Sequence, residues 1–358
     1  MSEFQCVTKV LSGPNAMEHL KKICPSRVLL VTDPYFTKNG AAKEVAAYFD
    51  GASVEIFDEV VPDPPAALAA KGAALCEQYR PDVLAALGGG SVIDCAKGIR
   101  AACEHPMLFV AVPTTSGSGS EMTSYAVLTK DGVKYPLTDP GLRPDVTILD
   151  DRYLGQLPPA LIAETGMDLL AHCMESLVGT NRSGFTDALS MHGIRTVLNS
   201  LTASYAGDRS VRMALHEAAA MAGLAFENAG LGLCHGLAHS MGSLFHIPHG
   251  RLCAMLLPHV MECNAEQALE KYAALARVCG LSAATDRLAL RSLQSELRRL
   301  RRTMGLPENL GQAGVTREQW AAYREGVVEA TLQDPCCQTN PLPVTRQMIE
   351  TVLKAVSP

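Results

Sequence analysis

The chain changes its local pattern near residue 150, from alternating strand-like and helical segments to helical segments alone. Short runs rich in aliphatic and β-branched residues recur before that point, at residues 28–32, 53–60, 82–89, 108–114 and 146–150. Alternation of this kind is typical of a parallel sheet with helices on both faces. After about residue 158 only helical periodicity remains, for example over 186–205, 208–226 and 267–280. The sequence therefore predicts an α/β domain over residues 1–155 and an all-helical domain over residues 156–358.

Composition narrows the class of protein. Of the 358 residues, 47% are hydrophobic and 19% charged, which favours a fully folded globular protein. The net charge of −6 argues against general affinity for nucleic acid or anionic lipid. The basic run at residues 295–304 is interpreted as the solvated face of a helix.

The chain offers no signal for export or membrane insertion. No apolar stretch approaches the length of a membrane span, and the first residues lack the pattern of a secretory signal. The twelve cysteines are scattered and none forms a C-x-x-C pair, which favours reduced core thiols over a disulfide framework. We therefore expect a cytoplasmic protein.

One carboxylate and three imidazoles in the helical half have spacings that suit a single metal ion. This set is Asp168, His172, His235 and His249. Asp168 and His172 are four residues apart, so on a helix both side chains project from one face. His235 and His239 repeat that spacing, and His249 follows across a turn that contains Pro248.

The chemistry of this set favours a borderline divalent cation. Three imidazoles and one carboxylate suit Fe, Zn or Mn, whereas an all-oxygen set would favour Ca or Mg and a thiolate set structural Zn. The alternative is that these histidines are hydrogen-bonded structural residues, which is how the histidines outside this region are interpreted. Nearby apolar residues suggest either a pocket for a short alcohol or ordinary core; they are Leu169, Met174, Leu237, Met241, Leu244 and Phe245.

A glycine-rich turn joins a strand to a helix within residues 82–104. Gly88, Gly89 and Gly90 can adopt positive φ and let backbone amides closely approach an anion at the positive end of the helix. Ser91 and Asp94 would join this site, although their spacing also fits a capping box that only completes the helix.

A second loop of small residues, at 112–124, follows the next strand and offers hydroxyl groups from Thr114, Thr115 and Ser118. Together the two loops suit a pyrophosphate. Neither loop matches the P-loop or the G-x-G-x-x-G turn of a βαβ unit, so a P-loop kinase and a standard Rossmann fingerprint are disfavoured.

Asp33 directly follows the strand at residues 28–32. An acidic residue there can accept from a ribose 2′-hydroxyl and repel a 2′-phosphate, which favours NAD over NADP. The alternative is that Asp33 simply forms the turn that ends the strand.

Four motifs carry a resemblance to a known family: GGGSVIDCAKG, PTTSGSGSE, GMDLLAH and GLCHGLAHSMGSLFHIPHG. In this order they resemble the successive signatures of the iron-containing (group III) alcohol dehydrogenases, along nearly the whole chain. Within that family the pattern is most similar to the 1-propanol dehydrogenases of propanediol utilisation.

The resemblance implies an N-terminal dinucleotide-binding α/β domain, an all-helical C-terminal domain and a bound ferrous ion, with NAD and the ion meeting in a cleft between the domains. The implied metal ligands are Asp168, His172, His235 and His249, and His239 would line the site without ligating. The implied contacts to NAD include Asp33, Gly89, Gly90, Ser91, Thr114, Thr115, Ser118 and Lys134. Asp63 departs from the family, many members of which have Asn there, so the adenine-side contact is open.

The resulting expectation is an NAD- and iron-dependent alcohol dehydrogenase or aldehyde reductase for short primary alcohols. The metal would act as a Lewis acid, and His239 would pass the alcohol proton toward solvent. Three alternatives remain open: a zinc-dependent polyol oxidoreductase similar to glycerol dehydrogenase, an NAD-using lyase of the dehydroquinate synthase type, and an inactive subunit that binds NAD or a partner protein. The resemblance also implies a homodimer, and association with a bacterial microcompartment is a further expectation.

Overall fold

The computed structural model describes residues 3–130, 133–281 and 283–358. The chain divides into two compact units. The first, here called the α/β unit, holds Cys6–Leu157 and Arg212–Gly223; the second, the helical unit, holds Pro158–Val211, Leu224–Pro358 and the N-terminal residues through Gln5.

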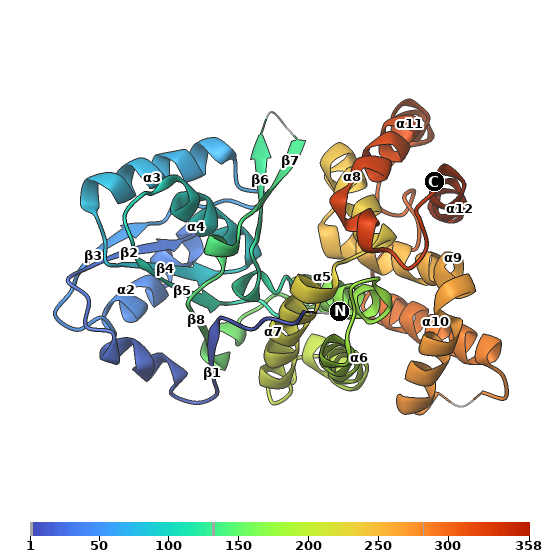
Figure 1. Ribbon diagram of the computed structural model, residues 1–358, viewed down its shortest axis with the longest axis horizontal. Coiled ribbons are helices and arrows are strands. Elements are labelled where there is room, and N and C mark those ends of the chain that lie inside the picture. Colours follow the sequence, from blue (N-terminus) through green and yellow to red (C-terminus); the bar gives the residue numbers. More distant parts are fainter. Residues whose placement is uncertain (1–2, 131–132, 282) are drawn as a thin grey trace. The chain divides into compact units, whose positions relative to one another are not determined.

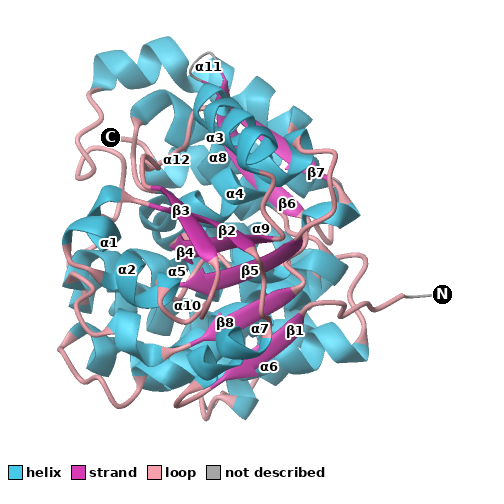
Figure 2. Ribbon diagram, turned by 90° about the vertical axis from the view of Figure 1, so that its left-hand side faces the viewer, coloured by secondary structure: helices cyan, strands magenta, loops and turns pink. Residues whose placement is uncertain are grey.

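A six-stranded sheet forms the centre of the α/β unit, and every neighbouring pair of its strands is parallel. In spatial order its strands are β1 (Lys9–Ser12), β8 (Val146–Leu149), β5 (Leu108–Pro113), β4 (Val83–Gly88), β2 (Arg27–Thr32) and β3 (Ser53–Phe57) (Figure 2). The parallel sheet is as predicted, and five of its strands lie where we expected them. Strand β1 was not predicted, because this edge strand has mostly exposed side chains and so lacks an apolar run.

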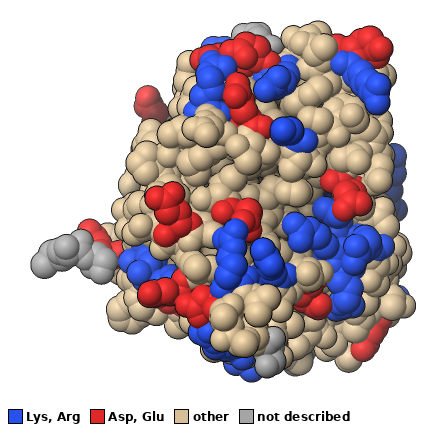
Figure 3. Space-filling view, turned by 90° about the vertical axis from the view of Figure 1, so that its right-hand side faces the viewer, with Lys and Arg blue, Asp and Glu red and all other residues tan. Residues whose placement is uncertain are grey.

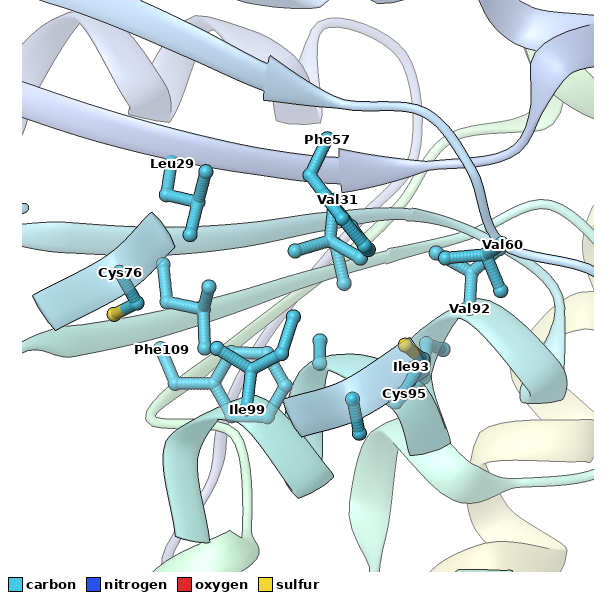
Figure 4. Packing of buried hydrophobic residues seen from close by; sticks show 14 of the residues in the cluster. Leu29, Val31, Phe57, Val60, Cys76, Val92, Ile93, Cys95, Ile99 and Phe109 are labelled. Atoms are coloured by element: carbon cyan, nitrogen blue, oxygen red, sulfur yellow. The ribbon is translucent and has the colours of Figure 1, made fainter. Parts of the chain in front are cut away.

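Helices cover both faces of this sheet, which explains why its central strands β2, β4 and β5 are almost entirely buried. Leu29 and Val31 of β2 point into one core together with Phe109 of β5 (Figure 4). Val28 and Leu30 point into the core on the other face. The first core is covered by α3 (Ala66–Tyr79) and α4 (Gly90–Ala102), and the second by η1 (Ala16–Lys22), α1 (Pro34–Lys38) and α2 (Ala41–Ala46).

An antiparallel hairpin of β6 (Tyr125–Lys130) and β7 (Val133–Thr138) follows β5. It contacts α3 and α4, and Leu128 packs into the first core. The hairpin was not predicted, because only alternate residues of β6 are buried and Pro136 interrupts β7. Short 3-10 helices connect the remaining segments: η2 (Ser120–Met122), η3 (Pro140–Leu142) and η4 (Asp151–Leu154).

The helical unit is built around α5 (Pro159–Val178), which packs against α6 (Gly184–Tyr205) and α9 (His249–Val278) (Figure 1). A Cβ atom on Gly166 would lie 2.2 Å from Leu201 Cδ1, so glycine permits the close contact between α5 and α6. Helix α7 (Arg212–Ala229) belongs to the α/β unit through Gly223 and to the helical unit from Leu224. The other elements of the helical unit are α8 (Leu233–Phe245), α10 (Asp286–Thr303), α11 (Arg317–Gln333), η5 (Pro335–Thr339) and α12 (Arg346–Val356). No described residue after Leu149 lies in a strand, as predicted.

The basic run at residues 295–304 lies on α10, and its interpretation as a solvated face is wrong for one residue. Arg301 is 1% exposed and forms an ion pair with Glu308. Arg301 lies one turn after Leu297, on the apolar face of the helix. Its side chain is therefore buried although it is charged. On the face shown in Figure 3, acidic and basic side chains are intermixed.

All twelve cysteines are free thiols, as predicted, but Cys6 and Cys24 are exposed and so do not lie in a core. Among the described residues, the structure contains no helix with the length and hydropathy needed to span a membrane.

Candidate metal centre and dinucleotide-binding loops

Helix α5 places Asp168 and His172 on one face, as their spacing predicted. Both side chains are buried. His235 follows two residues after the start of α8, and His249 is the first residue of α9. Gly250 lies inside α9, and a Cβ on it would lie 2.0 Å from the carbonyl oxygen of Glu164 on α5. Glycine at this position therefore lets the start of α9 approach α5.

The four side chains converge on one point. Asp168 Oδ1 lies 3.4 Å from His249 Nε2, 3.7 Å from His235 Nε2 and 3.9 Å from His172 Nε2. The rings of His172 and His235 stack with centroids 4.5 Å apart. The structure thus brings together all four residues that the sequence proposed as metal ligands.

The electrostatics of this cluster suit a cation. Burial alone would raise the pKa of the Asp168 carboxyl, but the three imidazoles outweigh burial and hold that pKa well below its usual range. Asp168 Oδ1 and His235 Nε2 are buried, and neither has a hydrogen-bond partner among the described residues. Unsatisfied buried polar atoms are costly unless something pairs with them, and a divalent cation would satisfy both atoms at once. The residues present therefore fit a metal ion of the predicted class.

Glu175, which was not proposed from the sequence, supports this cluster from α5. Its Oε2 lies 2.6 Å from His235 Nδ1, and its carboxylate accepts hydrogen bonds from the backbone N–H groups of Gly232, Cys234 and His235. Glu175 therefore caps the start of α8 and orients the imidazole whose Nε2 faces Asp168. Burial lowers the pKa of His235, but Asp168 and Glu175 together raise it to about 10. The signal in the sequence was its position on the face of α5 that carries Asp168 and His172.

His239 lies beside the converging residues and is held by a different carboxylate. Its Nδ1 lies 3.0 Å from Asp334 Oδ2, and its ring stacks on that of His249 with centroids 5.2 Å apart. Asp334 caps η5 by accepting from the backbone N–H of Cys336. The nearest thiol to the convergence is Cys253, whose Sγ lies 3.6 Å from His249 Nε2. Asp334 had no signal of this kind in the sequence, because only the tertiary fold brings it to His239. Cys253 lies four residues after His249 on α9, so the same helical spacing could have located it.

The glycine turn between β4 and α4 does not use the positive φ that its glycines can adopt. None of Gly88, Gly89 and Gly90 has positive φ. A Cβ on Gly88 would lie 2.4 Å from Val92 Cγ2, and one on Gly90 would lie 2.8 Å from Ser118 Oγ. Glycine is needed here for space: the turn packs on its own helix and against the second loop.

The capping box is absent. Helix α4 begins at Gly90 with Gly89 as its N-cap, and no side chain caps it. Asp94 instead accepts from Ser120 Oγ and from the backbone N–H of Val127. The first backbone N–H groups of α4 therefore have no competing side-chain cap, which suits an anion.

Lys97 ties the two loops together. It is fully buried on α4, and its ammonium group donates to Ser120 O, Ser120 Oγ, Thr123 Oγ1 and Tyr125 O at 2.5–3.0 Å. The backbone N–H of Thr114 also donates a hydrogen bond to the carbonyl oxygen of Gly88, at an N···O distance of 3.1 Å. The second loop is thus held beside the glycine turn.

The other residues expected near NAD are engaged within the protein. Asp33 Oδ1 accepts from the backbone N–H groups of Tyr35 and Phe36, so it caps α1 as the alternative interpretation proposed. Lys134 on β7 forms an ion pair with Asp63 at 3.1 Å. Thr115 and Ser118 border Gly89 and Gly90, respectively.

Two family models match this chain in succession. The model for iron-containing alcohol dehydrogenase matches residues 7–151, and the model for the C-terminal part of the same family matches residues 162–357.

Individual relatives span nearly the whole chain. A butanol dehydrogenase from Clostridium saccharobutylicum, described as NADPH-dependent, is 34% identical and covers 99% of this chain and 98% of its own length. A 1-propanol dehydrogenase from Citrobacter freundii is 35% identical over 95% and 96% of the two chains. The solved structure of an iron-containing alcohol dehydrogenase from Thermococcus thioreducens superimposes with a TM-score of 0.91, at 32% identity and 99% coverage of both chains. The chain therefore belongs to the iron-containing alcohol dehydrogenase family.

Proposed function

We propose that this protein is an NAD-dependent, Fe(II)-dependent alcohol dehydrogenase that interconverts short primary alcohols and their aldehydes. The observation that carries the proposal is the convergence of three imidazole nitrogens on Asp168 Oδ1, which has no hydrogen-bond partner among the residues that the structure describes. Metal-assisted hydride transfer needs a cation at the substrate oxygen and a dinucleotide beside it.

The four converging side chains would hold the ion, and Glu175 would fix the orientation of His235. When bound, the ferrous ion would supply Lewis acidity toward the substrate oxygen, and NAD would accept or supply the hydride. The glycine turn and the hydroxyl groups of Thr115 and Ser118 would hold the pyrophosphate. Lys97 and Asp94 would keep both loops in place without touching the cofactor.

His239 would move the alcohol proton. Burial raises the pKa of Asp334, but His239 and the N–H of Cys336 outweigh burial and lower it, so the carboxylate is ionised and accepts from His239 Nδ1–H. That hydrogen bond leaves Nε2 as the acceptor nitrogen. In alcohol oxidation Nε2 would accept the hydroxyl proton, and in aldehyde reduction it would return a proton to the same oxygen.

The metal assignment is tested with two variants of purified protein reconstituted anaerobically with Fe(II). Asp168→Asn keeps the shape of the side chain but removes its charge, and we expect loss of both bound iron and turnover. His239→Gln should retain iron and lose roughly 10²- to 10⁴-fold in kcat, the usual contribution of a general acid–base group. Full iron binding and turnover in Asp168→Asn would refute the ligand assignment.

The substrate class is tested with ethanal, propanal and butanal, each with NADH and with NADPH. Net oxidation of NADH by a simple aldehyde separates a dehydrogenase from a lyase that regenerates NAD within one turnover. The 1-propanol and butanol dehydrogenases among the relatives support short aliphatic substrates. Exclusive turnover of a polyol would favour the polyol oxidoreductase instead.

We propose that Asp33 determines the choice between NAD and NADP. One relative is described as NADPH-dependent, so this choice needs a direct test. Asp33→Asn keeps an oxygen for the cap of α1 but removes the charge that would repel a 2′-phosphate. We expect kcat/KM for NADPH to rise relative to NADH. Asp139→Asn, at the cap of η3, is the matched control. An unchanged cofactor ratio in Asp33→Asn would remove Asp33 from the ribose site.

We also propose a cytoplasmic homodimer, which the family resemblance supports, with association to a microcompartment in cells that build one. Light scattering of the purified protein tests the dimer. Fractionation of cells that produce the shell tests the association.

A further inference from the structure

Three potential metal ligands outside the converging set form a second cluster beside His249. They are His239 on α8, Asp334 at the cap of η5 and Cys336 within η5. One donor atom from each residue lies within 4.8 Å of the donor atoms of the other two. The cluster is held in shape from inside, because Asp334 Oδ2 meets His239 Nδ1 at 3.0 Å while Asp334 Oδ1 accepts from the Cys336 N–H at 2.9 Å.

The donor chemistry of this cluster differs from that of the first. Thiolate, imidazole and carboxylate together suit Zn²⁺ and other thiophilic cations, whereas three imidazoles and a carboxylate also accept Fe²⁺. In a tetrahedral zinc site, ligand atoms lie roughly 3.3–3.8 Å apart, given Zn–ligand bonds of about 2.0–2.3 Å. Side-chain rotations that move the donor atoms by about 1 Å would therefore close the cluster around an ion. The hydrogen bond from the Cys336 N–H to Asp334 would stay in place.

A cation from solvent can reach this cluster. The side chains of His239 and Asp334 are 26% and 13% exposed, about the same as those of His249 and Asp168 in the first cluster, at 25% and 12%. Three protein ligands would leave the fourth position of the ion to water, as in zinc sites that remain open to solvent.

We propose that His239, Asp334 and Cys336 form a second, inhibitory cation site selective for Zn²⁺ and similar thiophilic ions. On binding, the Cys336 Sγ–H bond breaks, its proton passes to solvent, and an Sγ–Zn bond forms. The zinc takes the lone pair of His239 Nδ1, so the ring proton moves from Nδ1 to Nε2. Asp334 contributes an oxygen, and the two negative ligands balance the charge of the ion.

The inhibition follows from the change of tautomer and rests on the proton-transfer role proposed above for His239. In the absence of zinc, Asp334 accepts from Nδ1–H and Nε2 is an acceptor. With zinc on Nδ1, Nε2 carries the proton and no longer accepts one from the alcohol. Zinc would therefore stop turnover without displacing iron.

The test uses iron-loaded protein under anaerobic conditions, titrated with Zn²⁺ for activity and with Co²⁺ for spectroscopy. We expect the protein to bind one further equivalent of Zn²⁺ per chain with iron content unchanged, and activity to fall in parallel. Co²⁺ should give the near-ultraviolet absorption of a thiolate–cobalt bond.

Two cysteine variants locate the site. Cys336→Ser keeps the backbone bond to Asp334 but removes the thiolate, and we expect its inhibition constant for Zn²⁺, relative to its own uninhibited rate, to rise by roughly tenfold or more. Cys253→Ser removes the thiol beside His249 and should remain as sensitive to zinc as the unmodified protein.

Three results would overturn the proposal: release of iron in step with inhibition, zinc sensitivity that is lost in Cys253→Ser and kept in Cys336→Ser, or no further equivalent bound. Metal stoichiometry and cobalt absorption do not require turnover. If zinc binds through Cys336 but no alcohol is oxidised, the cation site stands and the proposed function fails.

Discussion

At the scale of single residues, Glu175 connects the metal cluster to the rest of the helical unit. Its carboxylate is buried. It accepts hydrogen bonds from three backbone N–H groups and contacts the Nδ1 atom of His235. A carboxylate in this position fixes the ring orientation and raises the basicity of the ligand nitrogen.

We therefore expect Glu175→Gln to weaken metal binding by about 10- to 100-fold while the protein remains folded. The amide keeps the size of the side chain but has one acceptor oxygen in place of two. Competition with a chelator of known affinity measures the effect. Glu164→Gln on the same helix is the control, because the carboxylate of Glu164 pairs with Arg251 instead of an imidazole of the cluster. Equal metal affinity in both variants would contradict the role of Glu175.

The residues that the sequence located are those related by helical spacing. Asp168 and His172, four residues apart, define a face of α5 before any fold is known. Glu175 could have been added by extending that face one further turn. Asp334 could not, because its partner His239 is 95 positions away and only tertiary packing joins them.

At the scale of elements, the glycine turn and the second loop fit each other so closely that there is no room for a Cβ at Gly90. We expect Gly90→Ala to push Ser118 aside, to destabilise the protein by about 1–3 kcal/mol and to raise the Kd for NADH. Fluorescence titration with NADH and urea denaturation measure the two effects.

Gly326→Ala is the matched control for this substitution. Gly326 lies in α11 with no atom within 4 Å of a Cβ placed on it, so alanine should stabilise the helix by roughly 0.5–1 kcal/mol and leave NADH binding unchanged. Unchanged NADH affinity in Gly90→Ala would mean that the contact between the loops does not shape the dinucleotide site.

Elements were predictable where burial is continuous. Strand β4 is buried at every residue, and its apolar run was evident in the sequence. The hairpin of β6 and β7 and the edge strand β1 expose alternate or most residues, so hydrophobic pattern alone could not distinguish them from loops. The sequence located the glycine turn between β4 and α4 correctly. It could not show whether glycine is needed there for positive φ or for space.

At the scale of the whole molecule, His216 makes stability depend on pH. Burial lowers the pKa of its imidazole to about 4 from 6.5. Below pH 6.5 the unfolded chain binds a proton that the folded chain does not, so stability is lost as pH falls from about 6.5 toward about 4. At pH 5 the loss from this residue is about 2 kcal/mol.

Urea denaturation at pH 7 and pH 5 tests this expectation. In His216→Gln the decrease in unfolding free energy between the two pH values should be smaller by about 2 kcal/mol than in the unmodified protein. His192→Gln, at an exposed position of α6, should keep the full decrease. The same decrease in His216→Gln would show that His216 does not contribute.

Helix α7 has a consequence for how the protein can be made and divided. Its first residues, through Gly223, belong to the α/β unit: Arg212 donates to the carbonyl of Leu154, and His216 Nδ1 lies 3.1 Å from Ser116 Oγ. A ribosome delivers α5 and α6 before it delivers this last piece. The α/β unit therefore cannot finish folding during synthesis until Gly223 has emerged, and a fragment cut after Leu157 would lack part of its own core. An autonomous dinucleotide-binding module would have to be engineered by grafting Arg212–Gly223 back onto that fragment.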